Sequence, residues 1–308
     1  MNIVFMGTSG FGVPSAEAIL ESGRTIAAVV TTPDKPQGRG LRMLPSPVKQ
    51  WAESHSLKVL QPEKLRDTEF ISEMRAIAPD VIVVVAFRIL PPEIFGIPVR
   101  GAFNLHASLL PKYRGAAPIQ WAIINGERET GVTTFFLKEK VDTGNILVQE
   151  KITIGERETF GELHDRLSVL GVGAVVRTLE LIESSNVTAI QQDDTRSTPA
   201  PKITKEICRI DWRKPAAEIF NLIRGLSPSP GAWTTLHGII IKIFLSVPVE
   251  VPGVSPAPGI CAIGGTRLFV GTENGTLEIL EAQREGRGRM SAANFISGRN
   301  VHQDDIFK

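Results

Sequence analysis

The sequence predicts an α/β protein. A Rossmann-like, mostly parallel sheet with helices on both faces is followed by a smaller C-terminal β-barrel of the OB-like kind. Apolar runs alternate with amphipathic stretches over the first two thirds of the chain, as in parallel α/β sheets. Toward the C-terminus, short strand-like runs are separated by glycine and proline, which is typical of a small barrel. We expect a catalytic domain over 1–190, a linker over 191–205 and a second domain over 206–308.

Length and composition limit the class of protein. A chain of 308 residues is about two domains long, and 42% hydrophobic residues can form packed cores, which excludes a disordered or fibrous protein. The N-terminus lacks the basic start of a signal peptide, and the apolar runs fall short of the roughly 20 residues that span a bilayer. Cys208 and Cys261 give no disulfide framework and no zinc spacing. We therefore expect a cytoplasmic protein without a metal.

The net charge of +1 excludes a uniformly basic nucleic-acid-binding protein. The average conceals an asymmetry, because 13 basic side chains stand against 10 acidic ones over 201–308. A second basic segment lies between residues 31 and 50, where one acid, Asp34, accompanies Lys35, Arg39, Arg42 and Lys49. Any contact with a polyanion should therefore be local.

The elements of the first part follow from short apolar runs and from apolar residues at helical spacing. Strands are expected over 2–6, 26–32, 58–60, 81–86, 102–106 and 132–137, and helices over 14–21, 46–55, 67–77 and 117–124. A long helix is expected over 159–184, where Thr159 and Glu162 have the spacing of a capping box. A polar linker follows over 187–201. In the tail we expect a helix over 216–224 and strands over 239–245, 260–263, 267–270 and 276–281.

Gly7, Gly10 and Gly12 follow the first strand with the spacing G-x-x-G-x-G. The dinucleotide-binding fingerprint is G-x-G-x-x-G, and no carboxylate ends the second strand to hold a ribose. We therefore favour a tight turn that needs glycine torsion angles over the alternative of a nicotinamide-dependent oxidoreductase.

The segment over 33–49 contains four prolines and two glycines, so we expect most of it to lack regular structure. It is longer than the usual strand-to-helix connection. Its positive charge suits contact with a phosphodiester backbone, but a solvated insertion with incidental charge is an equally good interpretation.

The strand over 102–106 carries candidate catalytic residues. Side chains two apart on a strand face the same way, so Asn104 and His106 should project together. An amide and an imidazole in one cleft can stabilise an oxyanion and transfer a proton, and Asp142 is a candidate to orient the imidazole. A structural histidine is the alternative. A hydrolase triad with Ser108 is disfavoured, because no G-x-S-x-G motif is present.

Several motifs together resemble those of the folate-dependent formyltransferases, and most closely those of the bacterial methionyl-tRNA formyltransferases. The likeness covers nearly the whole chain. It is carried by NLHASLLPKYRGAAPIQWA at 104–122, GVTT at 131–134, VDTG at 141–144, PSPVK at 45–49, APKITKE at 200–206, RIDW at 209–212, IRGLSP at 223–228 and GRMSAANFISGR at 288–299.

The resemblance implies transfer of a formyl group from 10-formyltetrahydrofolate to the α-amino group of methionine on initiator tRNA. It implies that Asn104 and His106 bind the formyl oxygen, while Asp142 orients His106 and helps to remove a proton. Separately from the resemblance, no long exposed apolar face in the sequence demands a dimer, so we expect a monomer. The folate would contact Phe87, Arg88, Ile89, Leu90, Ser108, Leu109, Leu110 and Pro111, and the tRNA would contact Arg39, Arg42, Lys49 and Lys202.

The sequence departs from that family at two positions. Arg88 stands where the family usually has glycine, and in this the segment is closer to the glycinamide-ribonucleotide formyltransferases. Ser229 stands where tryptophan is common. Two alternatives remain open at this point. One is a formyltransferase that acts on a sugar-nucleotide amine, and the other is a non-catalytic tRNA-binding module.

Overall fold

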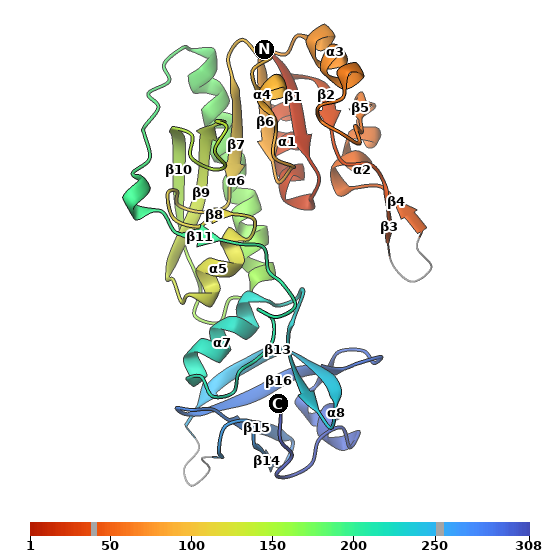
Figure 1. Ribbon diagram of the computed structural model, residues 1–308, viewed down its shortest axis with the longest axis vertical. Coiled ribbons are helices and arrows are strands. Elements are labelled where there is room, and N and C mark those ends of the chain that lie inside the picture. Colours follow the sequence, from red (N-terminus) through yellow and green to blue (C-terminus); the bar gives the residue numbers. More distant parts are fainter. Residues whose placement is uncertain (38–41, 251–255) are drawn as a thin grey trace. The chain divides into compact units, whose positions relative to one another are not determined.

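In the computed structural model, which describes residues 1–37, 42–250 and 256–308, seven strands from the first half of the chain form one sheet (Figure 1). Their order across the sheet is β10 (Ile146–Thr153), β9 (Glu129–Phe136), β7 (Ala102–His106), β6 (Val81–Val85), β1 (Asn2–Gly7), β2 (Thr25–Val30) and β5 (Val59–Leu60). β1 pairs in parallel with β2 and β6, and β6 pairs in parallel with β7, whereas β9 runs antiparallel to β7. The predicted mostly parallel sheet is thereby confirmed.

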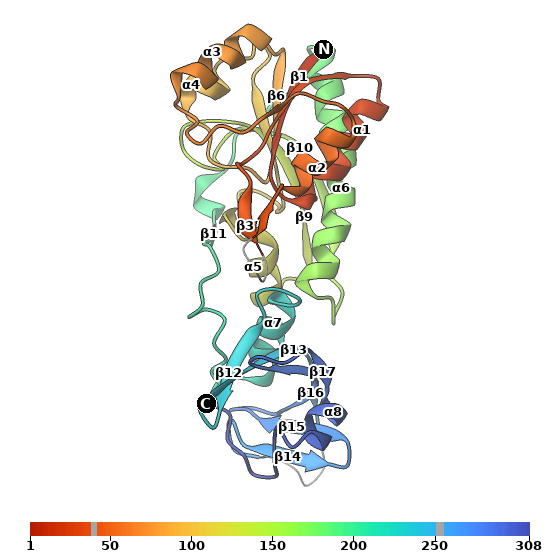
Figure 2. The ribbon, with the colours of Figure 1, turned by 90° about the vertical axis from the view of Figure 1, so that its right-hand side faces the viewer.

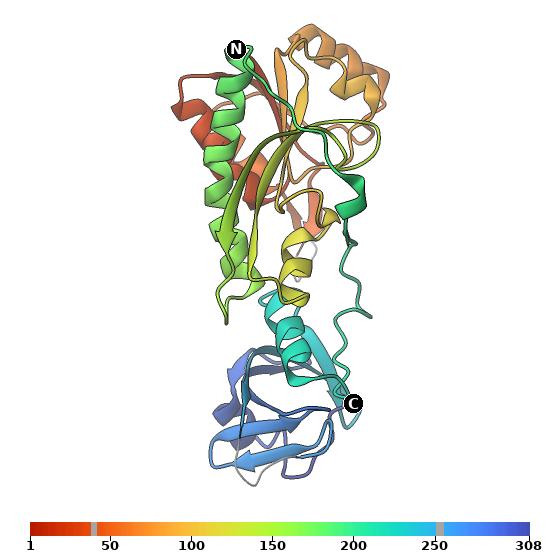
Figure 3. The same ribbon diagram turned by 90° about the vertical axis from the view of Figure 1, so that its left-hand side faces the viewer.

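Helices cover both faces of this sheet, as predicted (Figures 2 and 3). One face carries α1 (Val13–Glu21), α2 (Pro47–Ser54) and α6 (Phe160–Glu183), and the other carries α3 (Thr68–Ile77) and α4 (Pro92–Phe95). Alternate residues of β1 explain this arrangement, because Val4 shares a core with Phe70 of α3, whereas Phe5 faces the Trp51 ring of α2. No helix in the described parts of the chain is both long and apolar enough to cross a membrane.

The long helix α6 begins with the predicted capping box. The Glu162 carboxylate accepts hydrogen bonds from the Thr159 backbone N–H at 2.8 Å and from the Thr159 hydroxyl at 2.7 Å. These hydrogen bonds hold the pKa of Glu162 below its ordinary value. The Thr159 hydroxyl oxygen in turn accepts from the Glu162 backbone N–H at 3.4 Å, so the prediction is confirmed.

At the end of β1, two of the three glycines, Gly7 and Gly12, lie where a side chain would be crowded, and none of the three is needed for its torsion angles. None of Gly7, Gly10 and Gly12 has a positive φ, so the expected turn with glycine torsion angles is wrong. A Cβ atom on Gly7 would lie 3.0 Å from the Val85 carbonyl oxygen, and one on Gly12 would lie 3.2 Å from the Val85 Cβ. The backbone here, including the 3-10 turn η1 (Gly10–Gly12), therefore passes close to the end of β6.

Part of the proline-rich segment after β2 forms a two-stranded ribbon. β3 (Lys35–Gln37) pairs antiparallel with β4 (Arg42–Leu44), and Pro36 lies opposite Met43. The expectation that most of this segment is irregular is wrong, because proline is tolerated on a strand whose other edge pairs with no further strand. Arg39, one of the residues expected to contact tRNA, lies outside the described residues.

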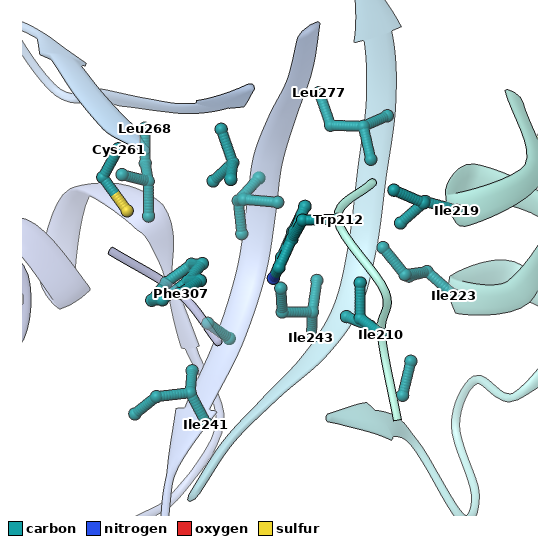
Figure 4. Close-up of a cluster of buried hydrophobic side chains, with 14 of the residues drawn as sticks. Ile210, Trp212, Ile219, Ile223, Ile241, Ile243, Cys261, Leu268, Leu277 and Phe307 are labelled. Atoms are coloured by element: carbon teal, nitrogen blue, oxygen red, sulfur yellow. The ribbon is translucent and has the colours of Figure 1, made fainter. Parts of the chain in front are cut away.

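The C-terminal part of the chain forms an antiparallel sheet with a core of its own. The strands are β12 (Ala232–Leu236), β13 (Ile239–Val249), β16 (Thr276–Arg284), β15 (Arg267–Gly271) and β14 (Cys261–Gly264), with β17 (Met290–Ser291) beside β16. Trp212 lies in this core, where its ring stacks on Phe307 (Figure 4). Ile219 and Ile223 of α7 (Ala216–Gly225) also pack into the core, and α8 (Ala292–Ser297) contributes Phe295. The prediction of a smaller C-terminal β domain is confirmed.

The contacts divide the chain into two compact units that interleave along the sequence. The first comprises Met1–Gly115, Thr130–Ile152 and His164–Ala200, and the second comprises Ala116–Glu129, Thr153–Leu163 and Pro201–Lys308. Within the second unit α5 (Pro118–Ile124) packs on α7. The Arg224 guanidinium of α7 donates to the Glu158 carbonyl oxygen at 3.2 Å. The functional boundaries expected at residues 190 and 205 stay a prediction.

Candidate active site

β7 places Asn104 and His106 on one face of the sheet, as the period of a strand requires. Ala102, two residues before Asn104, belongs to the core beneath α3 and α4. Leu105 points to the opposite face, where its side chain meets Gly171 of α6. His106 is buried, with 6% of its surface exposed, whereas Asn104 is half-buried.

The His106 ring is held by a hydrogen bond at one nitrogen atom and has a carboxylate near the other. Nε2 lies 2.8 Å from the Tyr113 carbonyl oxygen, and because a carbonyl can only accept, Nε2 carries a hydrogen and donates it. Nδ1 lies 3.8 Å from Asp142 Oδ2, which is within ion-pair distance but too long for a hydrogen bond. In the neutral ring Nδ1 therefore has a free lone pair beside a carboxylate. A proton taken up at Nδ1 would be stabilised by that negative charge.

The Asp142 carboxylate is presented by a strained turn after β9. Asp142 has a left-handed φ of 55°, and its Oδ2 accepts a 2.9 Å hydrogen bond from the Gly115 backbone N–H. The turn also requires glycine at position 144, because a Cβ atom there would lie 1.5 Å from the Phe136 carbonyl oxygen. The three predicted catalytic residues thus come from two segments, and the structure brings His106 and Asp142 together.

Of the three predicted catalytic residues, Asn104 has the side chain that is available to a ligand. Among the described residues it has no hydrogen-bond partner, whereas His106 and Asp142 are both engaged. Its Nδ2 group can therefore donate to an oxygen that arrives with a substrate. In the second unit, burial raises the pKa of the Cys261 thiol to about 12 and also raises the pKa of the Cys208 thiol, so both thiols resist ionisation.

A cavity of about 790 Å³ opens beyond the end of β6. Of the eight residues expected to contact folate, Arg88, Ile89 and Leu90 line it, and Glu139, three residues before Asp142, lies on its wall. The other residues that line it are Lys64, Leu65, Arg66, Pro91 and Pro92. It therefore combines an apolar wall with three cationic side chains.

Arg88 bridges two loops at this cavity. Its guanidinium donates to the carbonyl oxygens of Pro62 at 2.8 Å and Glu63 at 2.9 Å, and it lies 5.2 Å from the centre of the Phe87 ring. Burial lowers the pKa of Arg88. Its Nε atom is buried and has no partner among the described residues.

The expected folate residues of the segment after β7 are held by hydrogen bonds within the protein. The buried Ser108 hydroxyl donates to the Lys112 carbonyl oxygen at 2.7 Å, and the Leu110 backbone N–H donates to Thr133 Oγ1 at 3.2 Å. Gln149 donates to the Leu110 carbonyl oxygen at 3.0 Å. Leu109 and Pro111 are half-buried. The supporting residues Thr133 and Gln149 are not predicted as site residues, because nothing local in the sequence links them to this segment.

The residues expected to contact tRNA have different environments. Lys202 is exposed. Lys49, on α2, is 16% exposed and its Nζ lies 2.8 Å from Asp34 Oδ2, so it anchors the base of the ribbon. Arg42 begins β4, and Arg39 is one of residues 38–41, which lie outside the described ranges. Among the residues that are described, no cluster of His, Cys, Asp or Glu could hold a metal ion.

The ion pair at the base of the ribbon leads to a titration that can be measured. The pKa of Asp34 lies below its ordinary value, chiefly because Lys49 donates to its carboxylate and also because Gln61 does. A lowered pKa means that this interaction stabilises the fold at neutral pH and is lost as the pH falls through that lowered value. We expect Lys49→Met to raise the pKa of Asp34, measured from its carboxyl ¹³C shift. Lys58→Met, which removes the exposed pair with Glu73, is the control, and an unchanged titration in Lys49→Met would contradict the expectation.

Comparisons with known proteins show the family to which the chain belongs. Residues 1–179 match the family model for formyl transferase, and residues 202–300 match that for the formyl transferase C-terminal domain. Methionyl-tRNA formyltransferase of Pelotomaculum thermopropionicum is 46% identical over 97% of this chain and 96% of the relative, and that of Chlorobium limicola is 48% identical over 97% and 96%. An N-formyltransferase of Helicobacter canadensis, solved with folinic acid and dTDP-3-aminofucose, shares the fold with a TM-score of 0.67 and 23% identity over 92% of this chain and 98% of its own. The chain therefore belongs to the formyl transferase family and, within it, to the methionyl-tRNA formyltransferases.

Proposed function

We propose that the chain transfers a formyl group from 10-formyltetrahydrofolate to the α-amino group of methionine on initiator tRNA, in support of translation initiation. The identity of nearly half of all residues to methionyl-tRNA formyltransferases, over almost the full length of both chains, is the observation that carries this proposal. The geometry of Asn104, His106 and Asp142 supports it, because the trio offers one free donor and one proton acceptor.

The reaction replaces one carbon–nitrogen bond by another. The neutral amine attacks the formyl carbon, the bond from that carbon to N10 of the folate breaks, and one proton passes from the amine to N10. Asn104 Nδ2 donates to the formyl oxygen as negative charge develops on it. His106 Nδ1 accepts the proton from the amine and passes it to N10, while its Nε2 stays bound to the Tyr113 carbonyl oxygen. This role replaces the contact with the formyl oxygen that the resemblance implies, because the neutral ring has no free N–H to donate. Asp142 stabilises the resulting imidazolium.

The cavity beyond β6 suits the folate donor. Its apolar wall, with Ile89 and Leu90, matches the flat ring system, and its cations match the carboxylates of the glutamate tail. Arg88 contributes positive charge here because its guanidinium is fixed at the cavity wall. We propose that the segment over 108–111 contacts the donor through its backbone, since the Ser108 hydroxyl is bound internally.

We propose that the tRNA contacts the basic ribbon and Lys202. Charged tRNA is a cytoplasmic substrate, so the enzyme acts in the cytoplasm, and we propose that it does so as a monomer. Sugar-nucleotide amines are the alternative acceptors. The solved relative that carries such a ligand is 23% identical, which supports a shared fold and no more.

The deciding experiment is incubation of the full chain with methionyl initiator tRNA and 10-formyltetrahydrofolate, followed by release and analysis of the amino acid. We expect formylmethionine, and no product on a nucleotide-sugar amine. Unmodified methionine at saturating donor would overturn the proposal. Unchanged activity on a nucleotide-sugar amine after deletion of residues 37–43 would support the sugar-nucleotide alternative. tRNA binding without transfer would support a non-catalytic module.

The substitution Arg42→Ala tests the proposed contact between the ribbon and tRNA. Because a phosphate contact supplies affinity and not chemistry, we expect a higher KM for tRNA with kcat and the folate KM unchanged. The slope of log affinity against log salt should fall by about 1. Arg75→Ala, which removes an exposed arginine at the end of α3, is the matched control. An identical tRNA KM in the Arg42 and Arg75 variants would exclude a contact at Arg42.

A further inference from the structure

Residues 192–200, which we call the strap, contact both backbone segments that hold the His106–Asp142 pair. The strap contains the 3-10 turn η2 (Asp194–Arg196) and the strand β11 (Pro199–Ala200). β11 pairs in parallel with β8 (Arg114–Gly115), as Figure 1 shows. The pairing is so close that a Cβ atom on Gly115 would lie 2.5 Å from the Ala200 carbonyl oxygen. The polar residues after α6 therefore form part of the first unit.

The Gln192 side chain links two backbone segments: the turn that contains Asp142, and β8, whose Gly115 N–H donates to the Asp142 carboxylate. Its Nε2 donates to the carbonyl oxygens of Asp142 at 2.9 Å and of Gly144 at 2.8 Å. Its Oε1 accepts from Arg114 Nη2 at 2.7 Å and Nε at 3.1 Å. The side chain is 7% exposed, so water cannot easily replace these bonds.

The strap also fixes the carbonyl group that holds His106. Thr198 accepts a hydrogen bond from the Tyr113 backbone N–H at its Oγ1 atom, at 2.9 Å, and another from the Arg114 backbone N–H at its carbonyl oxygen, at 2.9 Å. Tyr113 has a left-handed φ of 60°, which a residue of its size adopts only when its surroundings impose it. The imidazole and the carboxylate are therefore both positioned from the strap.

We propose that Gln192 is a positioning residue for catalysis, which sets the approach of the Asp142 carboxylate to His106 Nδ1. The Gln192 side chain donates two hydrogen bonds from its nitrogen and accepts hydrogen bonds at its oxygen. A neutral amide on a side chain of this length can do both. Glutamate in its place would keep the bond from Arg114 but would lose both donations to the turn. The kinetic part of this inference rests on the proposed function, whereas its geometric part does not.

The experiment compares Gln192→Ala and Gln192→Glu with the wild type in the full chain. Gln303→Ala is the matched control, because Gln303 bonds the Ile263 backbone N–H in the second unit. Three quantities are measured for each protein: kcat with the KM of both substrates, the melting temperature, and the ¹⁵N shifts of the His106 ring at one pH, assigned with His106→Gln. Gln192→Glu keeps the Arg114 bond, so it separates positioning from any loss of folding in Gln192→Ala.

We expect both Gln192 variants to lower kcat by about 10- to 100-fold with both KM values unchanged, since a misplacement near 1 Å has effects of that size. The Nδ1 shift of His106 should move in both variants and stay constant in Gln303→Ala. A wild-type kcat and Nδ1 shift in Gln192→Glu would overturn the proposal. If the wild type forms no formylmethionine, the proposed function fails, and the ring shifts still decide the role of Gln192.

Discussion

Replacing Asn104 by alanine is expected to lower kcat by about 10²- to 10³-fold, the usual result of removing one oxyanion donor. The donor is needed when the formyl oxygen acquires charge, so the loss should fall on turnover and leave the folate KM nearly unchanged. Because the Asn104 side chain has no hydrogen-bond partner among the described residues, the substitution breaks no internal bond. Steady-state formylation with both substrates varied provides the measurement.

The control for this prediction is Asn186→Ala, which removes an exposed asparagine after α6. Melting curves of both variants should match the wild type, because neither change opens a large cavity. A rise in folate KM with an unchanged kcat would show that Asn104 binds the donor and does not act on the transition state.

Replacing Trp212 by alanine is expected to destabilise the second unit by about 3–5 kcal/mol, the usual cost of removing a large buried aromatic side chain. Trp212 is 4% exposed, stacks on Phe307 with ring centres 5.7 Å apart, and donates from Nε1 to Thr234 Oγ1 at 3.0 Å. Figure 4 shows that its ring lies among side chains from several elements, so the space cannot be refilled by one neighbour.

Hydrogen exchange locates this effect, because a chain with two units need not unfold in one step. The slowest amides of β13 and β16 should exchange roughly 10²- to 5 × 10³-fold faster in Trp212→Ala, which corresponds to the expected free energy at 1.36 kcal/mol per factor of ten. Amides of β1 and β6 serve as the internal control. Trp212→Phe, which keeps most of the volume, should show a much smaller effect. Equal acceleration of β1 would show that the destabilisation is not confined to the second unit.

The sequence predicts those parts of the fold that depend on neighbours along the chain. β6 is five consecutive buried residues, and the capping box at Thr159 needs a spacing of three, so both could be predicted locally. β10 is not among the predicted strands, because its second half, residues 149–153, is mostly polar and only half-buried or exposed. The ribbon of β3 and β4 was obscured by its prolines.

The candidate site divides in the same way. Asn104 and His106 are two apart on one strand, so their common direction follows from strand geometry alone. Gln192 is separated by 50 residues from Asp142, whose carbonyl oxygen it binds, and lies in a stretch whose polarity indicates a linker. A contact between residues so far apart in the sequence depends on the folded topology, so it cannot be predicted from local patterns in the sequence.

The membership of α5 in the second unit constrains how this protein can be dissected. Ile124 of α5 lies against Gly225 of α7, where a Cβ atom would be 2.8 Å from its Cγ1, and Trp121 donates from Nε1 to the Pro201 carbonyl oxygen. A fragment truncated after residue 190 would carry this helix without its packing partner, and a fragment that starts at residue 206 would lack it. No truncation at a single position yields two complete units. Separate expression therefore requires a rearranged gene in which residues 116–129 and 153–163 are joined to the C-terminal part.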